Sequence, residues 1–162
     1  MATSNNEEML LSELEQVSDG TYAFTRPLTL VTCALSPEYV CYPACKICNR
    51  KVLLETTKGG HHNVSICSVH GRQKGTAVYK YATGLLFADH KGNEVWATGF
   101  DQLVQEVVGG MTASDYMSLK SGDERYQSLN VLRGKQARVT IRKTTKGDYR
   151  NYTVIALEII HS

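Results

Sequence analysis

Residues 78–100, VYKYATGLLFADHKGNEVWATGF, largely decide the fold. Two apolar stretches, 78–89 and 94–100, flank His90-Lys91-Gly92-Asn93, which is a turn signal. The pattern predicts two long strands joined as an antiparallel hairpin.

Alternation along 94–100 divides the side chains between two faces, because successive residues of a strand point to opposite sides. One face carries Val95, Ala97 and Gly99, and the other carries Trp96, Thr98 and Phe100. We expect the small residues to face a tightly packed interior and the two large rings to lie outside.

Outward from this hairpin, the sequence predicts three more strands and a helical segment. A strand over 28–35 precedes the hairpin, and helical spacing over 101–119 follows it. Two last strands, over 136–144 and 149–160, flank a turn at Thr145-Lys146-Gly147-Asp148. Five strands with a helix between the third and fourth are the order of the oligonucleotide-binding (OB) barrel.

A chain of 162 residues is long enough for one such domain but not for two. We therefore expect a mainly β protein, with a five-stranded OB-fold barrel over 21–162. An insert at about 39–77 is expected between strands 1 and 2, and a helical segment between strands 3 and 4.

The first 20 residues form a separate acidic segment, with five acids and no base. Within it, residues 7–17 place Leu10, Leu14 and Val17 at helical spacing. This pattern predicts a short amphipathic helix that packs on the barrel.

The insert contains two short pairs of metal-ligand residues. Cys45 and Cys48 form a C-x2-C pair, and Cys67 and His70 form a C-x2-H pair, with 18 residues between the pairs. Two such pairs about 15–20 residues apart are the zinc-ribbon layout, in which two turns of chain supply one tetrahedral site. The spacing predicts one structural Zn²⁺, because four protein ligands leave no open coordination position.

Other residues near these pairs remain alternatives for the fourth ligand. Short strands are expected over 52–54 and 64–66, between the two pairs. His61 and His62, in the turn that joins these strands, could replace His70, and Cys41 is a further alternative. Cys33 is expected to be buried in a strand. The odd number of cysteines, five, argues against a disulfide framework.

Basic residues are concentrated near the end of the chain. Residues 133–150 carry seven bases against Asp148 alone, and alternation places Arg138, Thr140 and Arg142 on one face. Single-stranded nucleic acid needs cations for its phosphates and flat apolar platforms for its unpaired bases. The residues that we expect to bind nucleic acid are Trp96, Phe100, Arg138, Arg142, Lys143, Lys146, Tyr149 and Arg150.

Other functional classes lack the residues that they need. No H-x-E pattern accompanies the Pro43-Ala44-Cys45-Lys46-Ile47-Cys48 stretch, as a zinc deaminase would require. No G-x-S-x-G, phosphate-binding glycine loop or H-E-x-x-H occurs, so we expect no enzymatic activity. No apolar run approaches the about 18 residues of a membrane span, and residues 1–6 do not have the pattern of a secretory signal.

Three stretches make the chain similar to a known family. They are YPACKICNRKV at 42–52, WATGFD at 96–101 and VVGGMTASD at 107–115. With the order of ribbon, strands and aromatics, they resemble the C-terminal DNA-binding domain of the replication protein A large subunit, over roughly residues 27–160. The resemblance implies a nuclear protein that assembles with other OB-fold subunits in a heterotrimer. It also implies binding of single-stranded DNA in replication, repair or recombination, with stacking aromatics at Trp96 and Phe100 and another near Tyr149.

The sequence departs from the family in two places. The family's zinc site usually has four cysteines, whereas His70 stands at the fourth position. The family also continues into a C-terminal assembly helix, whereas this sequence ends at Ser162, just after the last predicted strand. Two alternatives therefore stay open. One is a telomeric or meiotic paralogue that binds single-stranded telomeric DNA, and the other is a zinc-ribbon scaffold that mainly assembles subunits.

Overall fold

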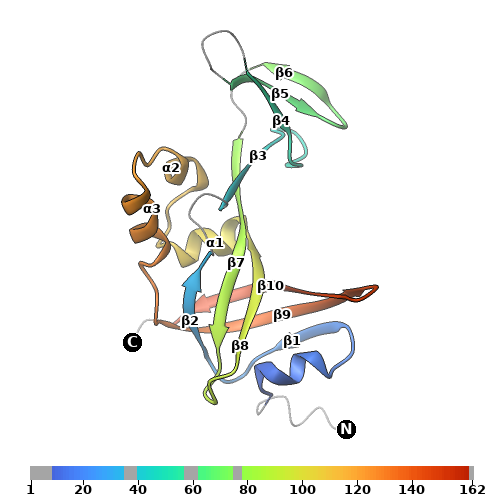
Figure 1. Cartoon of the computed structure of the whole chain (residues 1–162), viewed down its shortest axis with the longest axis vertical. Helices are drawn as coiled ribbons and strands as arrows, with labels where there is room; N and C mark the ends of the chain where they lie inside the picture. The colour runs from blue at the N-terminus through green and yellow to red at the C-terminus, as the bar shows by residue number, and fades with distance from the viewer. Residues whose placement is uncertain (1–8, 35–39, 57–61, 75–77, 161–162) are drawn as a thin grey trace.

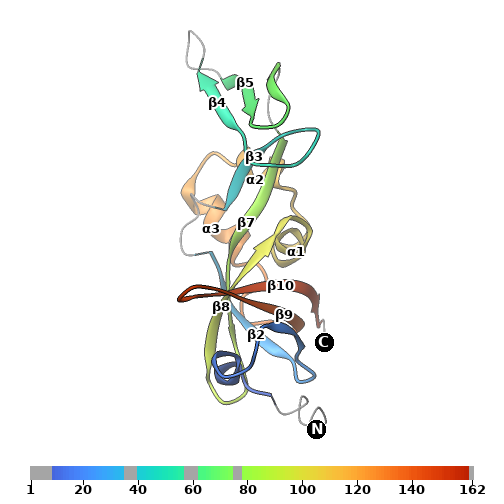
Figure 2. The ribbon, with the colours of Figure 1, turned by 90° about the vertical axis from the view of Figure 1, so that its right-hand side faces the viewer.

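The computed structural model describes residues 9–34, 40–56, 62–74 and 78–160. A barrel of long strands makes up one end of the molecule, and a small three-stranded sheet stands at the other (Figure 1). Figure 2 shows the same two parts from the side, with the helices α1 to α3 beside the upper barrel.

Five strands form the barrel: β2 (Leu28–Cys33), β7 (Val78–Ala88), β8 (Glu94–Phe100), β9 (Gln136–Lys146) and β10 (Tyr149–Ile159). Their order is β2-β7-β8-β10-β9, and β9 pairs in turn with β2, which closes the circuit. All of these pairings are antiparallel except that of β10 with β8. The closed circuit confirms the predicted mainly β OB fold.

The β7–β8 hairpin is antiparallel, and its two faces are those that the alternation predicted. Ala97 and Gly99 are turned inward, whereas Trp96 and Phe100 are exposed. A side chain at Gly99 would lie 2.9 Å from Cδ1 of Leu85, so the interior has no room for one. This close packing fixes which face of β8 is inside.

Three helices follow the hairpin: α1 (Asp101–Val107), α2 (Ala113–Met117) and α3 (Gly122–Leu129). The first two lie within the predicted 101–119 segment, and α1 packs against β7, β8 and β10. α3 lies outside the predicted helical segment. Its signal was present, because Ser121 caps the helix and accepts a hydrogen bond at 3.1 Å from the backbone N–H of Glu124. Among the described residues, no helix is long and apolar enough to cross a membrane.

The N-terminal segment, residues 9–19, packs against the other end of the barrel. Its helix is a 3₁₀-helix, η2 (Leu11–Glu15), rather than the predicted α-helix over 7–17, whose first two residues lie outside the described ranges. Leu11 and Leu14 are its buried residues, and Val17 is half-buried against the barrel core, so Leu11 takes the place of Leu10 in the expected stripe. A 3₁₀-helix repeats every three residues and therefore aligns Leu11 with Leu14.

Two short strands extend the barrel sheet, and neither was predicted. β1 (Gly20–Ala23) pairs with β9, and β3 (Cys41–Ala44) pairs with β7. Beyond β3, a separate sheet of β4 (Leu53–Thr56), β5 (His62–Cys67) and β6 (Gly71–Lys74) forms the ribbon.

Candidate functional site

Four side chains meet at the base of the ribbon: Cys45, Cys48, Cys67 and His70. Their ligand atoms all lie within 4.8 Å of one another. The Sγ atoms of Cys48 and Cys67 are 3.6 Å apart, and Nδ1 of His70 lies 3.7 Å from Sγ of Cys45 and 3.8 Å from Sγ of Cys67. These last three distances match the edges, about 3.5–3.8 Å, of a tetrahedron around zinc with sulfur and nitrogen ligands.

The backbone around the two pairs also favours thiolates. The N–H of Ile47 donates to Sγ of Cys45, and the N–H of Val69 donates to Sγ of Cys67, each at 3.4 Å. The Gln73 side-chain amide donates to Sγ of Cys45 at 3.2 Å. Burial alone would raise the pKa of the Cys45 thiol, but hydrogen bonds from Cys48, Ile47 and Gln73 outweigh it and lower the pKa to about 6.

The ribbon has a small core of its own, and the candidate ligands make up most of it. Cys45, Val52 and Cys67 are its buried residues, with Cys48 and Leu54 packed against them. The donor set could hold a metal ion, and its chemistry is compatible with zinc. Such an ion would supply the cross-links that this core lacks.

Of the alternative ligands, Cys41 does not join this cluster. Cys41 lies on β3 and packs against the barrel core. Cys33 is buried in β2, as expected. His61 and the side chain of His62 fall outside the described part of the chain.

An aromatic platform, Trp96 and Phe100, lies on the outer face of β8. The two residues are 37% and 49% exposed, as the alternation predicted. On β7, Ala82 pairs with Phe100, Gly84 with Thr98 and Leu86 with Trp96. Cε3 of Trp96 would come within 3.0 Å of a side chain at Gly84, so the ring lies over this glycine. The small residues Ala82 and Gly84 beside the two rings leave both rings partly exposed.

The platform continues across the sheet to a cation. Thr98, between the two rings, pairs with Thr153 of β10, and Thr153 pairs with Arg142 of β9. Directly paired residues point to the same side of a sheet. Arg142 is exposed, so the sheet presents aromatic rings, hydroxyls and a guanidinium on one continuous face.

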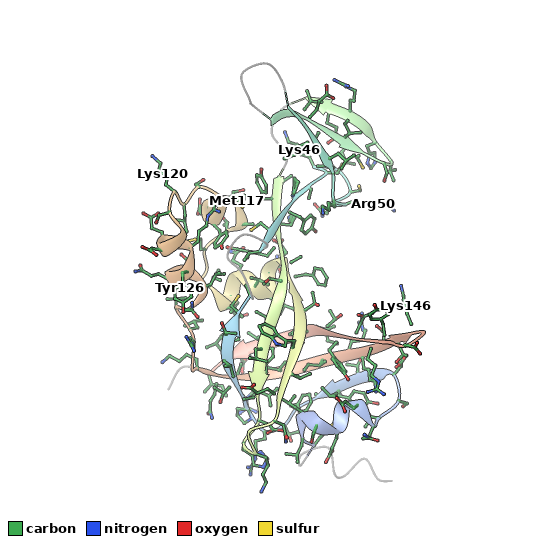
Figure 3. All side chains as sticks on the ribbon, in the orientation of Figure 1. Lys46, Arg50, Met117, Lys120, Tyr126 and Lys146 are labelled. Carbon is green, nitrogen blue, oxygen red and sulfur yellow. The ribbon has the colours of Figure 1, made fainter. Side chains whose placement is uncertain are left out.

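The other predicted nucleic-acid-binding residues of β9 and β10 do not all lie on this face. Lys146 pairs with Tyr149, which is 77% exposed, at the free end of the hairpin. Alternation places both on the same face as Arg142, and Figure 3 shows Lys146 at the end of the hairpin. Arg138 is on this face too, but its Nε lies 3.9 Å from a carboxylate oxygen of Glu158. Arg150 pairs with Thr145 and alternates to the opposite face.

Lys143 is buried, unlike the other cations of the hairpin, so its predicted role in nucleic-acid binding is corrected. The residue is only 4% exposed, on the inner face with Val139 and Ile141. Its Nζ donates to the backbone oxygens of Leu14, Glu15 and Val17, at 2.6, 3.3 and 2.7 Å. All three donors of the ammonium are therefore used in hydrogen bonds to the N-terminal segment, and none is left for a phosphate.

A groove between ribbon and barrel adds residues beyond those predicted to bind nucleic acid. It has a volume of about 560 Å³ and is lined by Cys41, Tyr42, Asn49, Arg50, Lys51 and Ala82. Ala82 is the pairing partner of Phe100, so the groove continues from the aromatic platform. The signal was the pair of bases Arg50-Lys51, which follows Cys48 after one residue.

The groove and the hairpin lie on the same side of the molecule. In Figure 3, Arg50 and Lys146 are on one side of β7 and β8, and Met117, Lys120 and Tyr126 are on the other. Asp101, next to Phe100, is the acid nearest to the platform in sequence. Its carboxylate lies 3.3 Å from Nζ of Lys80, which offsets its charge.

Comparisons with known proteins agree with this architecture. The family model for the replication factor-A C-terminal domain matches residues 28–157. No curated protein matches the chain, whereas six chains of solved structures do.

Two of these structures describe replication protein A. One is a replication protein A heterotrimer bound to single-stranded DNA, with a TM-score of 0.72 and 24% identity over 89% of this chain and 33% of that chain. The other is yeast replication protein A bound to single-stranded DNA, with a TM-score of 0.65 and 22% identity over 100% of this chain and 87% of that chain. These likenesses show the fold, and this chain spans about a third of the chain in the first structure. Because the family model covers most of the chain, the protein belongs to the replication factor-A C-terminal domain family.

Proposed function

We propose that this protein binds single-stranded DNA along the outer face of β7, β8, β10 and β9. The proposal depends mainly on the exposed rings of Trp96 and Phe100. They lie on the same face of the sheet as Arg142, two strands away. Two solved structures with this fold, described as bound to single-stranded DNA, support it. Stacking on an aromatic ring contributes about 1–3 kcal/mol per base, and nearby cations neutralise the phosphates.

The positions of the cations indicate the path of the DNA strand over this face. Arg142 and Lys146 stand on the hairpin side of the platform, and Arg50 and Lys51 stand on the ribbon side. A strand whose bases stack on Trp96 and Phe100 would therefore meet positive charge at both ends. Tyr42, which lines the groove, offers a further ring beside Arg50.

A salt titration with oligothymidine, which forms no duplex, tests this proposal. Neutralising four phosphates should give a slope of about −3 for log K against log salt, because each contact on a single strand contributes about −0.7. Arg142→Met should make the slope shallower by about 0.7. Absence of binding at low salt, or a slope near zero, would contradict the proposal.

The proposed cofactor is one structural Zn²⁺ at Cys45, Cys48, Cys67 and His70. When bound, the ion would cross-link both ends of the ribbon and so hold Arg50 and Lys51 beside the groove. The three thiols and the imidazole are ligands that zinc prefers. Metal analysis of the purified protein should give one zinc per chain.

For the cellular role, we propose replication, repair or recombination in the nucleus, in a complex with other OB-fold subunits. The family and the structure described as a heterotrimer support this setting. Stacking does not depend on sequence, so a telomeric repeat and a scrambled oligonucleotide should bind almost equally. A strong preference for the repeat would favour the telomeric alternative.

A second candidate function is subunit assembly through the ribbon. Ile47, Leu53 and Val69 are large apolar side chains that are more than half exposed on the ribbon. A contiguous patch of such side chains would offer a contact surface for another protein. A chain that co-purifies with its subunits but binds no oligothymidine would support this function instead.

A further inference from the structure

The β9–β10 hairpin projects beyond the barrel, and its two faces carry different groups. One face presents Arg142, Lys146 and Tyr149. The other lies against the N-terminal segment, which sits on the far side of the hairpin from the ribbon in both ribbon views (Figures 1 and 2). The hairpin is therefore held from behind by a part of the chain more than 120 residues away in sequence.

The first attachment is Lys143, in the middle of the projecting part. Its ammonium donates to the carbonyl oxygens of Leu14 and Glu15, the last residues of η2, and to that of Val17. A cation at the end of a helix, where carbonyls lack partners, is a stabilising arrangement. Lys143 directly follows Arg142, so this attachment fixes the backbone beside a proposed phosphate contact.

The second attachment lies close to the free end of the hairpin. Both carboxylate oxygens of Asp19 accept hydrogen bonds from Thr145, from the backbone N–H at 2.8 Å and from Oγ1 at 2.6 Å. These hydrogen bonds, led by that of the Thr145 side chain, hold the pKa of Asp19 below its ordinary value. Thr145 directly precedes Lys146, which is the outermost proposed cation of the hairpin.

From Lys143 toward the barrel, β1 pairs with β9, from Gly20 opposite Lys143 to Ala23 opposite Thr140. The segment thus follows the hairpin from the barrel almost to its turn. An isolated two-stranded hairpin is only marginally stable in water. Contacts on one face can order it while the other face stays free for a ligand.

We propose that the N-terminal segment is a clasp that positions the β9–β10 hairpin for single-stranded DNA, with Asp19 and Thr145 as positioning residues. The inference rests on the proposed function, because it concerns the same DNA-binding face. A hairpin that is already ordered avoids the entropy cost of ordering its side chains and backbone on binding.

Because Asp19 is negatively charged, the direction in which its removal changes the DNA affinity tests the proposal. An acid beside a cationic hairpin repels a polyanion, so removal of an acid that had only an electrostatic effect would strengthen binding. Removal of the clasp contact would weaken binding instead. The direction of the change therefore separates the two roles.

The experiment compares the full chain with Asp19→Ala, Thr145→Val and Glu13→Ala in binding to oligothymidine. Glu13→Ala is the matched control, because Glu13 is an exposed acid of the same segment with no side-chain bond to the hairpin among the described residues. We expect Asp19→Ala and Thr145→Val to weaken binding about three- to tenfold, mainly through faster dissociation. Glu13→Ala should bind as tightly as the parent or slightly more tightly.

Two further readouts distinguish positioning from direct contact. The slope of log K against log salt should stay unchanged in both clasp variants, because no phosphate contact is removed. Amide hydrogen exchange at residues 144–148 should become faster, while exchange in β7 stays the same. If the parent binds and Asp19→Ala binds equally well or more tightly, or if hairpin exchange does not change, the clasp is refuted and the proposed function stands. If the parent does not bind, both are refuted.

Discussion

Arg142 and Lys143 are adjacent on β9 and carry the same charge, yet their side chains have opposite surroundings. Arg142 is exposed in the row that leads to the aromatic platform, whereas Lys143 is buried against the N-terminal segment. Alternation within the strand explains the difference, because Lys143 continues the inner face of Val139 and Ile141. Grouping residues by charge alone therefore misassigned Lys143.

Substitution by methionine should therefore affect stability at Lys143 and DNA binding at Arg142. Lys143→Met should lower the free energy of unfolding by roughly 2–3 kcal/mol, because charged hydrogen bonds to three carbonyls are lost. Arg142→Met should leave stability nearly unchanged and weaken DNA binding. Denaturant unfolding and oligothymidine titration of both variants check this, and equal stability loss in the two would be contrary to the assignment.

Asp89 gives the molecule a specific dependence on acid. Its carboxylate accepts hydrogen bonds from the backbone N–H groups of Leu11, Lys91 and Asn93 and from the Asn93 side chain. Burial opposes ionisation, but hydrogen bonds from Leu11 and Asn93 outweigh it and hold the pKa below the ordinary value of 3.8.

Because the folded state lowers this pKa, the contribution of Asp89 to stability is complete above the unfolded value of 3.8. The contribution is lost as pH falls through the lower, folded value. Asp89→Asn should therefore be less stable than the parent at neutral pH, and the difference should shrink in strong acid. Unfolding curves at several pH values test this, and a difference that is constant with pH would count against it.

The sequence predicted the elements whose pattern is local and missed those that depend on a partner. The five barrel strands have clear alternation or long apolar runs, and the turn at 90–93 separates two of them. β1 has only four residues, and its pairing with β9 is what makes it a strand. The two cysteine pairs predicted which side chains meet, because a two-residue spacing lets a turn present both to one ion.

The ribbon and the barrel have separate cores, so they should respond differently to metal removal. The core of the ribbon consists mainly of the candidate ligands, whereas the barrel core contains large apolar side chains such as Phe87 and Leu85. Cys45→Ser and Cys67→Ser should lose bound zinc and protection of the ribbon amides while the barrel stays folded. Cys33→Ala is the matched control, because Cys33 is buried in the barrel and should keep one zinc per chain.

Full zinc content in both serine variants would refute the ligand set. His70→Ala tests the fourth position separately, because only this variant distinguishes His70 from His61 and His62. A marked loss of zinc affinity in His70→Ala is the expected result, since Nδ1 of His70 is the fourth donor of the cluster.

At the scale of the whole molecule, one face combines parts from distant regions of the sequence. The ribbon supplies Arg50 and Lys51, β8 supplies the platform, and the β9–β10 hairpin supplies Arg142 and Lys146. The helices α2 and α3 are on the opposite side (Figure 3). The sequence could indicate the separate residues, but only the closed barrel shows that they share a face.

The most direct test of this account is the affinity of Trp96→Ala and Phe100→Ala for oligothymidine, with Tyr126→Ala as the control. Tyr126 is also an exposed aromatic, but it lies on α3, away from the proposed face. Each platform variant should lose about 1–3 kcal/mol of binding free energy and keep its fold, and Tyr126→Ala should bind like the parent. Parental affinity in both platform variants would contradict the account.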